Sequence, residues 1–410
     1  VALEGYEQFF ANDDGSNIPM APPVLYKKFN RTSFWNENGK EVTKLPKDFY
    51  ATNYIMDKAI DMLKDRPKDK PFYLNISFTA VHFPIQAPEN VIQKYIPTYI
   101  KGWDIIRKER FERQKELGFF PYDYVLPQRD DVPRWDSLNE QEKQVAFSLL
   151  VPIEAKKMAV YAAMLDIVDQ NIGRLINYLK ENGEYENTVF FFMSDNGASD
   201  RDPAVDKHYH MVEWIQAKFD NSLKSIGSKH SFTGLSKGWA MAANTPFNRY
   251  KATMYEGGVH TVAFAYYPKL NVSGKRSNCV TSIMDIAPTI LDLAGVKYPE
   301  TYKGKPLTPM QGVSFASLIK DPSDSVGCDK NRYIGWEFVG IKGLRQGNWK
   351  LSQEAFDNEF NMFNLSKDPF EEVDLSQKMP ERFQQMKNVY KQYREENGVI
   401  DVPNSGGGGG

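Results

Sequence analysis

The sequence contains very little cysteine, with only Cys279 and Cys328 among 410 residues. The two form no C-x-x-C pair and no spacing typical of a metal site. This argues against a framework of several disulfides and against a structural zinc site. The sequence alone leaves open whether the two cysteines pair with each other.

Long apolar runs and an excess of one charge are missing as well. No apolar stretch comes near the roughly 20 residues that a membrane-spanning helix needs. The 51 Lys and Arg residues oppose 53 Asp and Glu residues, for a formal net charge of -2. This balance argues against a general nucleic-acid binder, which would carry a basic face. The hydrophobic content of 41% is ordinary for a globular protein, so a sizeable core can form.

Apolar periodicity predicts alternating helices and strands. A helix starting at Met158 has apolar side chains at three- and four-residue steps, ends near Gly183, and is followed by a strand over Val189–Met193. The order of elements predicts an α/β fold with a mixed, mostly parallel central sheet flanked by helices. The other predicted core elements are a helix over Asn53–Leu63, strands over Lys70–Phe78 and Thr261–Pro268, and a helix over Ser282–Val296.

The remaining segments predict how the chain divides into domains. The polar stretch Glu89–Gln144 is too long for a simple connector, and we expect it to form helical insertions over the core. After about residue 327, short strand-like pieces and a closing helix predict a small C-terminal α+β subdomain with an antiparallel sheet. We therefore expect a main domain over residues 1–326, the subdomain over 327–400, and a Gly-rich tail or linker over 401–410.

Asp195 and Asn196 stand directly after the strand predicted at Val189–Met193. Ligands of open α/β sheets bind beyond the carboxyl ends of the strands, and both side chains offer the oxygen ligands that Ca²⁺ or Mg²⁺ prefers. The alternative interpretation is a simple Asp-Asn-Gly turn. In isolation the motif favours neither.

Two further residues follow or precede predicted strands. His82 comes just after the strand at Lys70–Phe78, where a histidine can protonate a leaving group or hold an anionic ester. Lys251 precedes a Gly-Gly turn that leads into the strand at Thr261–Pro268, where an ammonium can neutralise an oxyanion. A histidine satisfied within a loop and a surface lysine are the ordinary alternatives. A metal pair, an acid and a fixed cation together favour hydrolysis of an anionic ester.

Several segments in the same order carry a family resemblance: TAVHFPIQAP, SDNGAS, NTPFNRYKATMYEGGV and LRQGNWKL…MFNLSKDPFEEVDL. Together they resemble the sulfatase family, arylsulfatase type, of the alkaline phosphatase superfamily. The resemblance extends over nearly the whole chain, up to about Gly398. It implies an alkaline-phosphatase-like fold, incomplete at the N-terminus, and hydrolysis of sulfuric esters.

The resemblance also implies residue roles. Asp195 and Asn196 look like two ligands of an active-site Ca²⁺, for which carboxylate and amide oxygens suit a hard cation better than zinc. His82 and Lys251 look like the residues that bind the sulfate group and assist departure of the alcohol. His208 and His210, in a polar segment, are interpreted as solvated loop residues and not as zinc ligands.

Other elements of the family pattern are missing from the sequence. Cys279 is followed by VTSIM and Cys328 by DKNRY, so neither fits C-x-[PSA]-x-R, the motif whose cysteine becomes the formylglycine nucleophile. The Asp-Asp pair that completes the calcium site is absent too. We expect these elements on a missing N-terminal segment of the same protein, and we expect this chain alone to be inactive.

Two other functions remain open from the sequence. One is a phosphonate or phosphate ester hydrolase of the same superfamily, which would use the same metal pocket. The other is a non-catalytic sulfatase-like protein that binds sulfated glycans. The natural substrate and the oligomeric state stay open. The sequence only weakly favours the periplasm or the cell exterior as the location.

Overall fold

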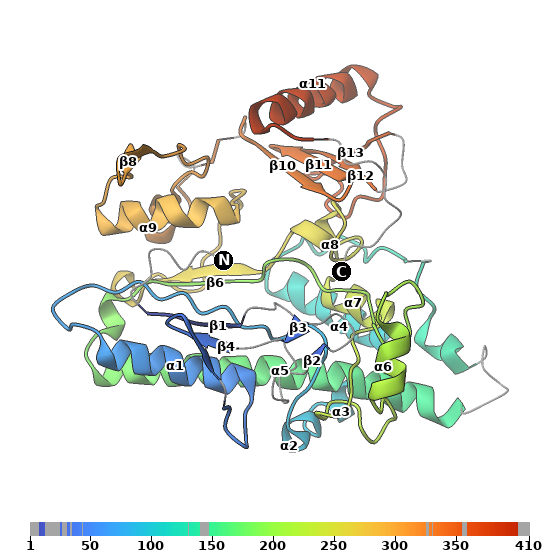
Figure 1. Ribbon diagram of the computed structural model, residues 1–410. Coiled ribbons are helices and arrows are strands. Elements are labelled where there is room, and N and C mark those ends of the chain that lie inside the picture. Colours follow the sequence, from blue (N-terminus) through green and yellow to red (C-terminus); the bar gives the residue numbers. More distant parts are fainter. Residues whose placement is uncertain are drawn as a thin grey trace. The chain divides into compact units, whose positions relative to one another are not determined.

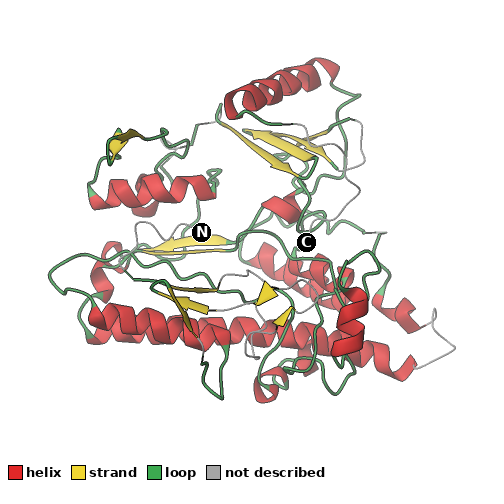
Figure 2. Ribbon diagram, viewed as in Figure 1, coloured by secondary structure: helices red, strands yellow, loops and turns green. Residues whose placement is uncertain are grey.

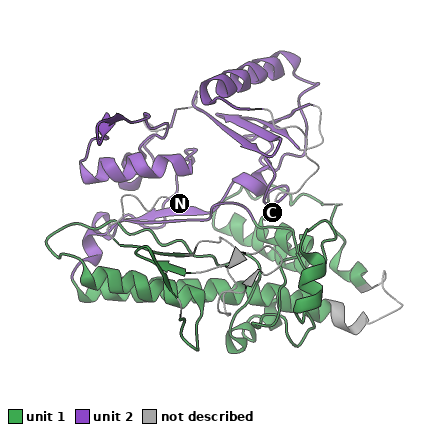
Figure 3. Cartoon of the chain, viewed as in Figure 1, with its two compact units in different colours: residues 1–182, 198–246, 410 green, residues 183–197, 247–409 purple. Residues whose placement is uncertain are grey.

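The computed structural model describes residues 8–12, 25–26, 31–32, 35–42, 44–129, 131–139, 147–324, 328–329, 331–354 and 359–400. The chain divides into two compact units (Figure 3). Unit 1 comprises Val1–Asn182 and Ala198–Pro246, and unit 2 comprises Gly183–Gly197 and Phe247–Gly409. Each unit therefore contains stretches that are separated in the sequence. The domain boundary predicted near residue 327 differs from this division and stays a prediction.

Unit 1 is mainly helical (Figure 2). Its short strands form two small antiparallel sheets, one of order β1-β4-β5 and one of β2 and β3. The elements are β1 (Phe10–Asn12), β2 (Leu25–Tyr26), β3 (Arg31–Thr32), β4 (Trp35–Glu37), β5 (Lys40–Val42), α1 (Ala51–Asp65), α2 (Glu89–Ile92), α3 (Ile96–Tyr99), α4 (Trp103–Glu116), the 3₁₀ turn η2 (Trp135–Asn139), α5 (Phe147–Glu181), α6 (Val212–Lys218) and α7 (Lys237–Ala243).

Helix α5 is the longest element of unit 1 and runs beside α1 (Figure 1). Val168, Leu175 and Leu179, at steps of seven and four positions, are buried on one face. Gly183, in the left-handed conformation with φ of 69°, follows the helix as expected. The predicted helix is confirmed, but it begins at Phe147, earlier than the predicted Met158, and it contains Pro152.

The helical insertions predicted for Glu89–Gln144 are confirmed within residues 89–129 and 131–139. Helices α2, α3 and α4 and the turn η2 lie there, and α4 packs against α7. The indole rings of Trp103, Trp135 and Trp239 meet edge to face, with centroid distances between 4.7 and 5.7 Å. These three aromatic rings, all buried, therefore hold the insertion against the body of unit 1.

Unit 2 combines a two-stranded sheet of β6 and β7 with a four-stranded sheet of β10 to β13. In the larger sheet every neighbouring pair is antiparallel, and α11 packs on one face through a cluster of Leu344, Leu351, Met362, Met386 and Tyr390 (Figure 1). The small C-terminal α+β subdomain is thus confirmed. The elements are η3 (Tyr185–Asn187), β6 (Phe190–Met193), α8 (Glu256–Val259), β7 (Ala263–Tyr266), η4 (Pro268–Leu270), η5 (Ile283–Asp285), α9 (Ile286–Ala294), β8 (Thr301–Tyr302), β9 (Lys305–Pro306), α10 (Ala316–Lys320), β10 (Tyr333–Phe338), β11 (Ile341–Gln346), β12 (Trp349–Gln353), β13 (Asn361–Asn364) and α11 (Pro380–Asn397).

Two of the three predicted core strands are confirmed, as β6 and β7, but they pair antiparallel, with Phe191 opposite Ala265. The strand predicted at Lys70–Phe78 is wrong, because this segment has no ladder partner within the described residues. Its side chains nevertheless alternate between exposed and half-buried, as in an extended chain. The apolar pattern identified the extended conformation correctly but could not supply a neighbouring strand.

The two cysteines form a disulfide, with Cα atoms of Cys279 and Cys328 5.3 Å apart. It joins the segment before α9 to the segment before β10. Among the helices that the structure describes, none is both long enough and apolar enough to cross a membrane.

Candidate active site

Asp195 and Asn196 lie in a bend that begins where β6 ends. The backbone N–H of Ser194 donates to the carbonyl of Val262 at 3.0 Å, which continues the β6–β7 pairing by one step. The Ser194 hydroxyl donates to the carbonyl of Asn196, also at 3.0 Å. Asp195 is exposed and Asn196 is half-buried. The bend therefore presents a carboxylate and an amide from a fixed backbone.

Lys251 lies in a loop over residues 248–258, which we call the Lys251 loop. The N–H of Gly257 donates to the carbonyl of Asn248 at 2.7 Å and so closes the loop. Inside it, the Thr253 hydroxyl donates to the carbonyl of Tyr250 at 2.8 Å. A Cβ atom at Gly257 would lie 2.2 Å from the Arg249 carbonyl oxygen, and one at Gly258 would lie 2.2 Å from that of Thr253. Only glycine allows this close approach of backbone to backbone.

One hydrogen bond connects the bend to the Lys251 loop. The N–H of Gly197 donates to the carbonyl of Gly258 at 3.0 Å. Within unit 2, the structure therefore brings the segment carrying Asp195 and Asn196 next to the loop carrying Lys251. His82 belongs to unit 1.

His82 is half-buried, and its position in unit 1 is fixed by its neighbours. Its ring stands at a tilt against the ring of Phe83, with centroids 4.3 Å apart, and Phe83 is buried in an apolar cluster with Phe232. Nδ1 of His82 lies 2.8 Å from the carbonyl oxygen of Phe83. Because a carbonyl oxygen only accepts, Nδ1 carries the proton there. The neutral ring then presents Nε2 as an acceptor, and the protonated ring presents it as a donor.

A buried group of charges lies against the Lys251 loop in unit 2. Nζ of Lys350, on β12, is 2.7 Å from Oε1 of Glu256 and 2.9 Å from Oε1 of Glu371. The side chain of Lys350 is fully buried, and those of the two glutamates are at most 4% exposed. His260 Nδ1 and Arg345 Nη1 also approach Glu256 Oε2, at 2.8 and 3.6 Å.

The two glutamates of this group respond differently to their surroundings. Burial by itself would raise the pKa of Glu256, but the nearby Lys350, His260 and Arg345 outweigh it and hold that pKa below its ordinary value. Burial and the neighbouring Glu256 charge raise the pKa of Glu371 to about 7, although Lys350 opposes them. Glu256 is therefore the ionised partner of Lys350, and Glu371 gains its charge only near neutral pH.

A second buried ion cluster fixes the segment that follows Ala198 in unit 1. Nζ of Lys157, on α5, lies 2.6 Å from Glu154 Oε1 and 2.8 Å from Asp202 Oδ2. Oδ1 of Asp202 accepts from the N–H groups of Ala204 and Gly234, each at 3.0 Å. Burial alone would lower the pKa of Lys157, but the two carboxylates raise it above its ordinary value. Asp202 therefore anchors this segment through its ion pair and its two backbone hydrogen bonds.

The donor set fits a hard cation only in part. Asp195 and Asn196 supply oxygen ligands, which suits Ca²⁺, but Ca²⁺ takes about 6–8 of them. Within the described part of the chain, no group of three or more His, Cys, Asp or Glu side chains is placed to hold a metal. His208 and His210 are exposed loop residues, in keeping with their interpretation as solvated.

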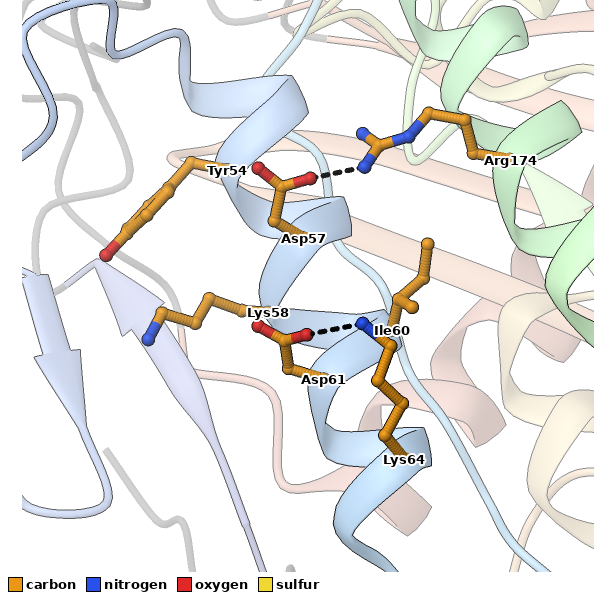
Figure 4. A pocket seen from close by; sticks show the side chains of 7 residues that line it. All are labelled: Tyr54, Asp57, Lys58, Ile60, Asp61, Lys64 and Arg174. Atoms are coloured by element: carbon orange, nitrogen blue, oxygen red, sulfur yellow. Dashed lines mark hydrogen bonds and ion pairs between the residues drawn. The ribbon is translucent and has the colours of Figure 1, made fainter.

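A surface hollow of about 390 Å³ lies on unit 1 between α1 and α5 (Figure 4). Its charged side chains are paired: Arg174 with Asp57, Lys64 with Asp61, and Lys58 with Glu37. None of the four candidate site residues lines it. The hollow is therefore not the candidate active site.

Comparison with known protein families decides the assignment. The family described as Sulfatase matches residues 3–296, more than half of the chain. The chain belongs to the sulfatase family. A second match, described as N-sulphoglucosamine sulphohydrolase, C-terminal, covers residues 248–397 and so begins at the Lys251 loop.

Curated relatives agree with the family assignment. An uncharacterized sulfatase of Schizosaccharomyces pombe is 33% identical over 98% of this chain and 71% of its own length. An arylsulfatase of Klebsiella aerogenes is 32% identical over 70% of this chain and 59% of its own length. The chain thus spans 71% of the length of the first relative and 59% of the length of the second.

Solved structures confirm the fold class. The crystal structure of Ps i-CgsB matches with a TM-score of 0.58 at 19% identity, covering 95% of this chain and 66% of that one. A structure solved in complex with its substrate D-glucosamine-2-N,6-O-disulfate matches with a TM-score of 0.54 at 20% identity, covering 92% of this chain and 74% of that one. Both have the α/β sulfatase fold, and this chain has the same fold.

Proposed function

We propose that this protein hydrolyses sulfate monoesters as an arylsulfatase-type enzyme. The observation that carries the proposal is the Gly197–Gly258 hydrogen bond, which brings the Asp195–Asn196 bend next to the Lys251 loop. In a chain of the sulfatase family, this adjacency supports a role for Asp195 and Asn196 as oxygen ligands and for Lys251 as a cation near the same end of the β6–β7 pair. The arrangement suits an ester that carries negative charge.

Each residue has a definite task in the proposed reaction. The Lys251 ammonium binds the sulfate oxygens and offsets charge that builds up on them. His82, protonated and with Nδ1 held by the Phe83 carbonyl, donates a proton from Nε2 to the departing alcohol oxygen. Asp195 and Asn196 hold Ca²⁺, or Mg²⁺ as the alternative hard cation, through their side-chain oxygens. When bound, the cation supplies Lewis-acid polarisation of the sulfate oxygens.

We infer that the nucleophile of the proposed reaction lies outside these 410 residues. Neither cysteine fits the formylglycine motif, and the two are joined to each other in a disulfide. We assign the formylglycine, together with the remaining metal ligands, to a segment of the same protein that this sequence does not include. The disulfide also suits an oxidising compartment such as the periplasm or the cell exterior.

The substrate class is tested by comparing turnover of 4-nitrophenyl sulfate and 4-nitrophenyl phosphate in the complete protein with added Ca²⁺. We expect the sulfate to be the better substrate by kcat/KM, and we expect the 410-residue chain alone to turn over neither. Preference for the phosphate would favour the phosphoester alternative. Turnover by the chain alone would refute the assignment of the nucleophile. Tight binding of sulfated sugars without turnover by the complete protein would favour a binding protein.

A further inference from the structure

Lys350 has no task in the proposed chemistry, yet it is among the most deeply buried charged side chains of unit 2. It lies on β12, opposite Arg345 of β11 in the strand register. Taking an ammonium out of water is costly, and an apolar side chain at such a position is often as stable or more stable than the ion pair. Stability alone therefore does not explain Lys350, and its role is inferred from the segments that its ion pairs hold in place.

The two carboxylates that contact Lys350 reach both ends of the Lys251 loop. Glu256, the first residue of α8, lies near the C-terminal end of the loop, and its N–H donates to Oε2 of Glu371 at 2.6 Å. At the other end, the Asn248 side-chain amide donates to the main-chain carbonyl of Glu371 at 3.4 Å. Glu371 therefore holds both ends, and Lys350 holds the carboxylate of Glu371 against that of Glu256.

Apolar contacts hold the same loop against the same sheet. Met254 packs against Gly343 of β11, where a Cβ atom would lie 2.9 Å from the Cβ atom of Met254. The ring of Tyr255 packs against that of Phe363 on β13, with centroids 5.7 Å apart. The C-terminal sheet thus contacts the Lys251 loop on one face, while α11 covers the opposite face.

We propose that Lys350 is a positioning residue for Lys251, acting through Glu256 and Glu371 to fix both ends of the Lys251 loop on the C-terminal sheet. The inference deepens the proposed function and rests on it, because the loop is assumed to present Lys251 to the sulfate group. The contacts themselves do not depend on that function. Lys350 is fully buried and contacts no substrate in this account. The ion pairs are directional, so they fix where the loop lies in a way that an apolar contact does not.

The test compares Lys350→Met with a matched control, Met362→Ala. Met362 is fully buried on β13, one residue before Phe363, and so faces α11 instead of the loop. Both substitutions weaken the same sheet, but only the first removes the charge that holds the glutamates. Hydrogen exchange with mass spectrometry would follow peptides covering residues 248–258. We expect at least tenfold faster exchange there in Lys350→Met and less than threefold in Met362→Ala.

A second readout reports on Lys251 itself in the intact 410-residue chain. Trace acetylation of lysines, read by mass spectrometry, gives the reactivity of Lys251 with and without inorganic sulfate, with exposed Lys275 as the internal reference. We expect sulfate to protect Lys251 about fivefold in the original chain and in Met362→Ala, and less than twofold in Lys350→Met. The result separates a positioning role from general loosening of the sheet.

The outcomes distinguish the two proposals. Equal exchange in Lys350→Met and Met362→Ala would overturn the positioning role, whatever sulfate does. No sulfate protection in the original chain, with the exchange difference present, would count against sulfate binding at Lys251 and leave the positioning role standing. If Lys350→Met does not fold, Glu371→Gln replaces it, with the same direction of change expected and a smaller size.

Discussion

At the scale of single residues, two glycines decide the conformation of the Lys251 loop. Gly257 and Gly258 allow backbone atoms to approach where a Cβ atom would overlap carbonyl oxygens. The sequence alone predicted this Gly-Gly pair as a turn beside Lys251, but both glycines lie in the short helix α8. Lys350 and Glu371 were not identified, because a lysine within a strand and a glutamate within a loop show no partner until the chain has folded.

The first prediction concerns Gly257→Ala. Since the new methyl carbon would lie 2.2 Å from the Arg249 carbonyl oxygen, the loop must shift. We expect a loss of about 2 kcal/mol in the free energy of unfolding, typical of an overpacked site. Denaturant titration would measure it. As a control, Gly173→Ala in α5 meets no atom within 4 Å and should stabilise the protein by up to about 1 kcal/mol. Equal effects of the two substitutions would contradict the steric argument.

At the scale of elements, several helices and strands were predictable. Helix α5 and strands β6 and β7 follow from apolar periodicity, and the C-terminal strands follow from their alternation and turns. The segment Lys70–Phe78 shows the limit, because periodicity predicts an extended chain but not the neighbour that turns it into a paired strand. Contacts between distant elements, such as Lys350 of β12 with Glu256 of α8, were likewise beyond sequence reasoning.

The contact between β12 and α8 predicts a pH dependence. The pKa of Glu371 is raised, so its stabilising contribution is complete below its ordinary value of 4.5 and is lost as the pH rises through about 7. The pKa of Glu256 is lowered, so its contribution is present above 4.5 and is lost as the pH falls. Together the two glutamates favour the mildly acidic range.

Glu371→Gln tests this pH dependence, because glutamine keeps the size of the side chain but does not titrate. We expect the stability lost between pH 5 and 8 to shrink by about 2 kcal/mol relative to the original protein, from the usual cost of about 1.4 kcal/mol for each pKa unit. Thermal unfolding at a series of pH values would show it. Glu372→Gln, at the exposed neighbouring residue, serves as the control and should leave the pH profile unchanged. Parallel profiles for the original protein and Glu371→Gln would contradict the assignment.

At the scale of the whole molecule, two compact units and one disulfide define the organisation of the chain. The sequence predicted two parts, but not that residues 183–197 would belong with the C-terminal half, because such interleaving depends on β6 pairing with β7. The cysteines were left open, since spacing does not determine whether two isolated cysteines meet. For the candidate site, the metal and catalytic roles of Asp195, Asn196 and Lys251 stay predictions.

The disulfide is expected to contribute strongly to the stability of unit 2. Cys279 and Cys328 are 49 positions apart in the sequence, and closing a loop of that length stabilises a fold by about 4 kcal/mol in the chain-entropy account. We expect dithiothreitol to lower the midpoint of thermal unfolding clearly, and Cys328→Ser without reductant to reproduce the reduced protein. A midpoint that is insensitive to both changes would mean that the two cysteines are not paired.

The central claim is that Lys251 binds the sulfate group of an ester substrate, and it is tested most directly by one substitution. In the complete protein with Ca²⁺, kcat/KM for 4-nitrophenyl sulfate should fall by at least about 100-fold in Lys251→Ala, in line with the loss of one charge-stabilising group. Lys275→Ala, which removes an exposed lysine of the same unit, should leave kcat/KM within twofold of the original protein. Equal kcat/KM values for the two variants would contradict the account.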